Sequence, residues 1–176
     1  MGYCCCKKKR WTKTATLSFL RSELLHDIAN YAYVEADVMK TDDDHQRHQV
    51  FDVTQEGNVE RVTRVLDLTF AEINELCYPF TKMNIEDGAS DSDFYNEAYA
   101  YNIEMRLPDG FSETTFKLLK EYVHEMLVSR VLADWFSITY PEKSAVWLAK
   151  AEDMRDKMKS VLFARTGRTR RPTSPF

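Results

Sequence analysis

The chain has 176 residues, of which 44 % are hydrophobic and 30 % charged, which is enough apolar material for one core of ordinary size. It contains no apolar run of 18 residues and no hydrophobic segment typical of a secretory signal, which argues against a membrane-spanning or secreted class. The net charge of -4 is unevenly distributed. Residues 1–13 hold five Lys/Arg, residues 165–176 hold four Arg, and neither segment holds an acid. The 15 basic and 28 acidic residues that remain give residues 14–164 a net charge of -13. This distribution predicts that the basic segments contact negatively charged partners, with other copies of the chain among the candidates.

Residues 1–15 begin MGYCCCKKKRWTK and are expected to form a flexible basic arm. A lipid anchor is the alternative. Gly2 is a myristoylation candidate, the run Cys4–Cys6 offers palmitoylation, and a polybasic run follows. Position 6 is Cys where the myristoylation motif has Ser or Thr, and this favours the arm.

Residues 16–39 are expected to form the first helix, because apolar residues recur at three- and four-residue steps: Leu17, Leu20, Leu24, Ile28 and Tyr31. The pattern stops between residues 40 and 57. There Asp42–Asp44 precede His45 and His48, a composition that could bind a divalent cation but is more typical of an acidic loop. Residues 49–53 suggest a short extended piece.

Residues 58–77 are expected to form a second helix, with Asn58 as its N-cap and Pro79 after its end. Its inner face comprises Val62, Val65, Leu66, Thr69, Ile73 and Leu76. An insertion follows over 81–107. Its first part is polar, and residues 98–107 alternate with a period of two, which predicts a strand. The alternating apolar side chains are candidates for contact between subunits: Tyr99, Tyr101, Ile103 and Met105. The partner of this strand is expected to be either the 49–53 segment or a strand of another copy.

Two long helices are expected over 112–136 and 141–164. Ser112 is a good N-cap, and Thr139 and Glu142 have the spacing of a capping box around Pro141. The second helix carries an apolar stripe that can pack on a neighbouring helix: Trp147, Ala151, Met154, Met158 and Val161. The predicted fold is therefore mainly α, a bundle of four principal helices with a short β element in an insertion and extended termini. A helical domain over 16–164 lies between the arm 1–15 and the tail 165–176.

The tail 165–176 contains four arginines, two prolines and no acid, so it cannot bury itself. We expect it to become ordered when it docks on a partner. Arginines can contact carboxylates in a bidentate manner, and an aromatic residue can occupy an apolar pocket. The expected docking residues are Arg165, Arg168, Arg170, Arg171 and Phe176.

No arrangement of residues points to catalysis. The five glycines are scattered, so no phosphate-binding loop is present, and no serine lies in a nucleophile elbow. His26 and His124 fall on expected helices, where packed or surface histidines are the usual outcome. We therefore expect no enzymatic activity, cofactor or metal site.

This layout resembles the head–tail connector (adaptor, neck) proteins of tailed bacteriophages. The matching features are the four helices, the insertion, the tail, and the stretch from Tyr101 to Ser112 followed by Ala133–Trp135. The resemblance implies a structural virion protein that forms a ring, with twelve copies on a twelve-fold portal, and that contacts the portal protein and other neck or tail proteins. It implies no membrane and no specific nucleic acid as partners. It also implies a location in the virion neck, and in the host cytoplasm during assembly. The CCCKKKR segment departs from the family.

Two other classes of function remain open on the sequence. One is a lipid-anchored peripheral membrane protein, and the other is a helical regulatory module that binds nucleic acid through its basic segments.

Overall fold

The computed structural model describes residues 11–40, 44–81, 99–108 and 111–163. In these residues the chain forms six α-helices, one 3₁₀ turn and two strands. In chain order these are β1 Trp11–Leu20, α1 Arg21–Val38, α2 Asp44–Phe51, η1 Asp52–Thr54, α3 Val59–Leu76, α4 Tyr78–Thr81, β2 Ala100–Pro108, α5 Glu113–Thr139 and α6 Pro141–Phe163. The prediction of a mainly α fold with a short β element is confirmed. No helix in the described part of the chain is both long and apolar enough to cross a membrane.

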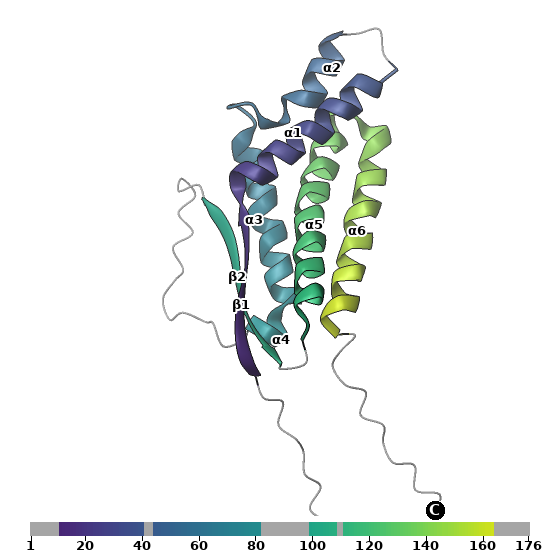
Figure 1. Cartoon of the computed structure of the whole chain (residues 1–176). Helices are drawn as coiled ribbons and strands as arrows, with labels where there is room; N and C mark the ends of the chain where they lie inside the picture. Colours follow the sequence, from purple (N-terminus) through teal and green to yellow (C-terminus); the bar gives the residue numbers. More distant parts are fainter. Residues whose placement is uncertain (1–10, 41–43, 82–98, 109–110, 164–176) are drawn as a thin grey trace, which may run out of the picture.

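Helix α5 is the centre of the bundle. It lies between α3 and α6, while α1 crosses one end of the bundle and the two strands lie beside α3 toward the other end (Figure 1). Its C-terminal half is buried on several sides, as the consecutive buried residues from Met126 to Ser129 show. A helix that is apolar around most of its circumference must be enclosed by neighbours. The other elements therefore arrange themselves around α5.

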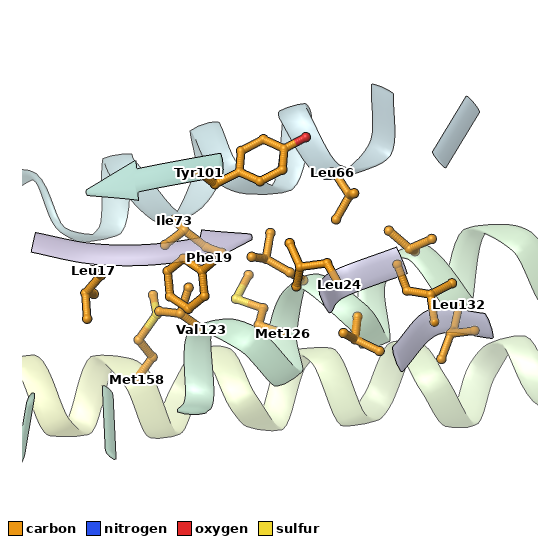
Figure 2. Packing of buried hydrophobic residues seen from close by; sticks show 14 of the residues in the cluster. Leu17, Phe19, Leu24, Leu66, Ile73, Tyr101, Val123, Met126, Leu132 and Met158 are labelled. Carbon is orange, nitrogen blue, oxygen red and sulfur yellow. The ribbon is translucent and has the colours of Figure 1, made fainter. Parts of the chain in front are cut away.

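The core joins the sheet to the helices. Leu17 and Phe19 of β1 lie close to Val123 and Met126 of α5 and to Met158 of α6 (Figure 2). All five side chains are at most 3 % exposed. Burying side chains of this size contributes roughly 1.5–3 kcal/mol each. The strands are therefore part of the same hydrophobic core as the helices.

The beginning of the first predicted helix is wrong, because residues 11–20 form strand β1 and α1 begins at Arg21. β1 pairs antiparallel with β2, placing Leu17 opposite Ile103 and Phe19 opposite Tyr101. In Thr14–Phe19, polar and apolar residues alternate over positions that also fit a helical spacing. The pairing with β2, about 90 residues later in the chain, selects the strand over the helix. Residues 11–15 of the expected arm belong to this strand.

The segment after α1 is also more helical than expected. Residues 44–51 form α2 and residues 52–54 a 3₁₀ turn, so the expected extended piece at 49–53 is wrong. Val50 and Val53 are fully buried in the core. The 49–53 segment is therefore not the partner of β2, and β1 takes that role.

The remaining helices follow the sequence closely. Helices α3, α5 and α6 lie where they were predicted, and the Ser112 hydroxyl accepts a hydrogen bond from the Thr115 amide at 3.2 Å, as an N-cap should. Two of the predicted helix caps do not form. The Asn58 side chain donates to the Asp52 carbonyl instead of capping α3. Thr139 is the last residue of α5, and its hydroxyl bonds back to the Trp135 carbonyl, so the expected capping box with Glu142 does not form.

Candidate functional site

Most of the apolar residues of β2 face the interior of the chain. Tyr101, Ile103 and Met105 are at most 4 % exposed, and the Tyr101 hydroxyl donates to Asp67 Oδ1 at 2.8 Å. These three side chains are therefore unavailable to a neighbouring subunit, which corrects the expectation that they form an inter-subunit surface. Tyr99, just before the strand, is 82 % exposed and remains a candidate for such a contact.

The predicted docking residues Arg165, Arg168, Arg170, Arg171 and Phe176 lie outside the described residues. The structure does show where the segment that carries them is attached. Helix α6 ends at Phe163 at the same end of the bundle at which β1 begins at Trp11 (Figure 1). β1 runs away from that end and α6 runs toward it (Figure 1), and Leu17 and Phe19 of β1 lie close to Met158 of α6 (Figure 2).

Both basic segments are consequently joined to one end of the folded domain. Four basic residues precede β1, Lys7, Lys8, Lys9 and Arg10, and four arginines follow α6. Two described lysines near that end pair with acids of their own helix, Lys117 with Glu113 at 2.9 Å and Lys159 with Asp156 at 3.4 Å. The Glu113 contact raises the pKa of Lys117, chiefly through its hydrogen bond.

A second feature is a pocket of about 310 Å³ between α1 and α5. It is lined by Ser22, Glu23, His26, Asp27 and His124. His124 Nε2 donates to Asp27 Oδ2 at 2.7 Å, and this contact links helices that are 97 residues apart in sequence. The imidazole also lies beside Phe19, with ring centroids 6.5 Å apart. Sequence reasoning treated His26 and His124 as ordinary helical residues, and it had no signal that would bring Asp27 to His124.

The possible cation site at Asp42–Asp44, His45 and His48 is not assembled in the described residues. Both histidines lie on α2, where His45 shares a hydrogen bond with Gln49 at 3.1 Å and His48 lies against the Phe51 ring at 5.0 Å. Asp42 and Asp43 are outside the described residues. Among the residues that are described, no three His, Cys, Asp or Glu side chains group in a way that could hold a metal ion.

A polar and aromatic cluster fastens α6 to α1 and α5. Glu35 of α1 accepts from the Trp147 indole at 3.2 Å and pairs with Lys143 at 3.0 Å, a hydrogen bond that raises the pKa of Lys143. Lys150 pairs with Glu125 at 2.8 Å and lies 4.7 Å from the centre of the Trp147 ring. Such cation–π contacts stabilise by roughly 0.5–2 kcal/mol. This cluster fastens the first half of α6 to α1 and α5.

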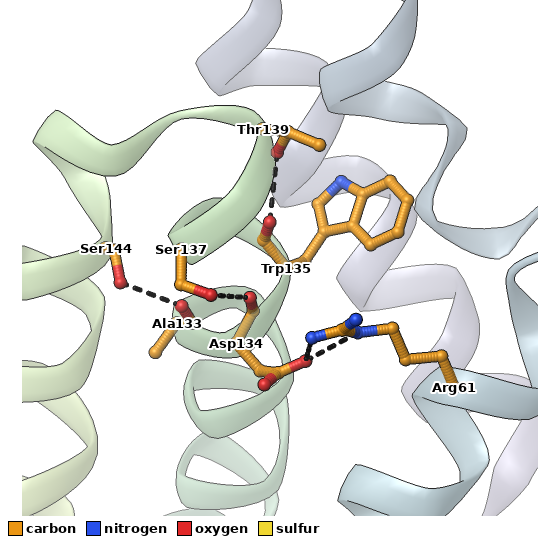
Figure 3. Close-up of polar contacts among 7 residues, drawn as sticks. All are labelled: Arg61, Ala133, Asp134, Trp135, Ser137, Thr139 and Ser144. Carbon is orange, nitrogen blue, oxygen red and sulfur yellow. Dashed lines mark hydrogen bonds and ion pairs between the residues drawn. The ribbon is translucent and has the colours of Figure 1, made fainter.

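The C-terminal end of α5 is held by a second group of polar contacts (Figure 3). Asp134 pairs with Arg61 of α3 at 2.9 Å, and the Ser144 hydroxyl of α6 donates to the Ala133 carbonyl at 2.9 Å. The Trp135 indole donates to the Val50 carbonyl at 2.7 Å, which ties α2 to α5. These contacts orient three elements around the last turns of α5.

Cys77 is fully buried at the end of α3, and burial raises the pKa of its thiol to about 12. The thiolate is the reactive form of cysteine, so this side chain acts as a small apolar residue of the core.

No protein-family model matches the chain, and no curated protein or solved structure matches it.

Proposed function

We propose that the protein is a structural subunit of a tailed-bacteriophage virion. It acts as a head–tail connector, an adaptor in the neck that forms a homo-oligomeric ring, docks on the portal protein and joins the capsid to the tail. Its mechanism is adhesion, without catalysis or cofactor. It resides in the virion neck, and in the host cytoplasm during assembly.

The observation that carries this proposal is the attachment of both basic segments to one end of a well-packed helical domain (Figure 1). The attachment points of both basic segments lie at that end, while the sides of the bundle stay available for neighbours in a ring. Helix α6 ends at Phe163 at that end of the domain, which agrees with the contact with the portal that the family resemblance implies.

Ring closure requires a heterologous interface, in which one face of a subunit meets a different face of the next. Unequal faces suit this arrangement, because like charges repel and unlike charges attract. The strongly acidic domain and its basic segments provide unequal faces. Tyr99 is the predicted inter-subunit residue that the structure leaves exposed. The resemblance implies twelve copies.

Cryo-electron microscopy of intact particles tests the proposal. We expect a ring of this protein between capsid and tail, with the end that carries Trp11 and Phe163 against the portal. A location away from the neck, or a single copy in each particle, would reject it.

A variant in which Arg165, Arg168, Arg170 and Arg171 are replaced by Gln should fold normally, because no core position changes. It should be incorporated into particles poorly. The matched control replaces four exposed basic residues of the domain by Gln: Lys40, Arg64, Lys120 and Lys157. It carries the same change in charge and should be incorporated like the unmodified chain. Equal incorporation of both variants would contradict docking through the arginines.

A further inference from the structure

We propose that the edges of the β1–β2 sheet join neighbouring copies of the chain, with the outer edge of β1 in one copy pairing with the outer edge of β2 in the next. This inference rests on the proposed ring function, because it names the contact between subunits of that ring. Within the described residues the sheet has two strands, so each strand has one neighbour and one outer edge (Figure 1). Such an edge carries backbone donors and acceptors that can pair with a further strand.

The hydrogen-bonding pattern of the pair shows which residues turn their backbone groups outward. The Arg21 amide donates to the Tyr99 carbonyl at 3.1 Å, one step beyond the pair of Leu20 and Ala100. In an antiparallel pair, opposite residues that exchange hydrogen bonds alternate with opposite residues that do not. Counted from Arg21, the residues whose N–H and C=O groups point away from the partner strand include Thr14, Thr16 and Ser18 of β1 and Asn102 and Arg106 of β2.

The outer edge of β1 is open in the described part of the chain. Thr14, Thr16 and Ser18 have exposed side chains, and no backbone hydrogen bond links them to a described element other than β2. Edge strands are usually protected by charged residues, prolines or bulges. Between Thr14 and Ser18 β1 has none of these, since the irregularity of the pair lies between Trp11 and Lys13. This edge is uncharged, so the charged side chains of a β2 strand would meet no like charge along it.

The outer edge of β2 is the matching surface. β1 has ten residues and β2 has nine, so the two edges are nearly equal in length. A small rotation about a ring axis keeps corresponding strands of neighbouring subunits in the same sense. Because β1 and β2 are antiparallel within one chain, β2 of one copy then meets β1 of the next copy antiparallel as well. A ring closed in this way uses both edges of every copy, whereas a two-fold dimer through β1 leaves each β2 edge open.

Proline substitutions can block the edges without breaking the pair inside the chain. Thr16 and Asn102 turn their N–H groups outward, so a proline at either position removes a donor from an edge while the hydrogen bonds between β1 and β2 remain. Thr16→Pro blocks the β1 edge and Asn102→Pro blocks the β2 edge. The matched controls are Thr16→Ala and Asn102→Ala, which shorten the same side chains and keep the N–H groups. Thr14→Pro and Arg106→Pro replace the first pair if circular dichroism shows that either of its members is unfolded.

The experiment is sedimentation of the full-length chains under reducing conditions, at protein concentrations up to about 1 mM, where an interface with a Kd in that range is populated. The unmodified chain and the alanine controls should form species larger than dimers as the concentration rises. Each proline variant alone should remain a monomer. Their equimolar mixture should form a dimer of one copy of each and nothing larger, because the open β2 edge of Thr16→Pro meets the open β1 edge of Asn102→Pro.

Three results would overturn the inference. A monomeric unmodified chain at every concentration would mean that the edges are closed, for example by another segment of the same chain. Monomeric Thr16→Pro with dimeric Asn102→Pro, and no complex between the two, would show a two-fold contact between β1 strands. Self-association of both proline variants would place the contact on the helices.

The inference and the proposed function fail separately. A neck ring that contains either proline variant at normal occupancy would reject the strand contact and retain the connector. Formation of the mixed dimer by a protein that is absent from the neck would retain the strand contact and reject the connector.

Discussion

Replacement of Ile103 by Ala separates a core role for β2 from a role between subunits. Ile103 is 1 % exposed and lies opposite Leu17, which is fully buried. The change removes three carbon atoms, each contributing about 0.8 kcal/mol on burial, and it leaves a cavity that adds to the loss. We expect the free energy of unfolding to fall by about 3 kcal/mol, which corresponds to a decrease in Tm of roughly 6–12 °C for a chain of this size.

The assay is urea unfolding of the monomeric chain, followed by far-ultraviolet circular dichroism. Asn102→Ala is the matched control, because Asn102 is the preceding residue of the same strand and its side chain is exposed. It should change the stability by less than about 0.5 kcal/mol. The reasoning is refuted if Ile103→Ala leaves the monomer within about 1 kcal/mol of the unmodified chain while self-association is lost. That outcome would place the side chain at a subunit interface.

Three further changes test contacts elsewhere in the domain. Trp135→Phe removes the donor to the Val50 carbonyl at 2.7 Å and should destabilise by about 1–3 kcal/mol in urea unfolding; a loss below about 0.5 kcal/mol would mean that the bond is dispensable. A double-mutant cycle of Arg61→Ala and Asp134→Ala should give a coupling of at most about 1 kcal/mol that weakens with salt, because their side chains are 47 % and 37 % exposed; a coupling above about 2 kcal/mol at high salt would contradict this. Folding raises the pKa of Cys77 to about 12, so only the unfolded chain releases this proton between pH 9 and 12. Over that window the free energy of unfolding should fall by up to about 1.4 kcal/mol per pH unit relative to Cys77→Ala, and parallel pH profiles of the two proteins would disprove it.

The sequence alone determined the elements whose signals are local. α5 was predicted with Ser112 as its N-cap, and the structure shows the cap that this residue was expected to form. β2 was predicted from strict alternation of polar and apolar residues. These signals lie within a few residues of one another, so they can be recognised without knowledge of the rest of the chain.

The candidate site was only partly accessible to the same reasoning. The basic residues that carry the proposed function are visible in the sequence. The sequence does not show that the basic segments are attached to one end of the domain. This depends on how many times the chain crosses the bundle and in which direction. The contact of Asp27 with His124 likewise needs α1 and α5 to be placed first.

The tertiary structure decided which of two local patterns residues 11–20 follow and where the apolar face of β2 is buried. Leu17 fits a helical face with Leu24 and also fits a strand with Phe19. Hydrogen bonding to β2 selects the strand, and that partner lies about 90 residues further along the chain. With β1 paired to it, the apolar face of β2 packs on the helices of its own chain instead of on a neighbour. Pairing between distant segments has no local signature, which is why the periodicity of β2 predicted a strand but not the surface that it would cover.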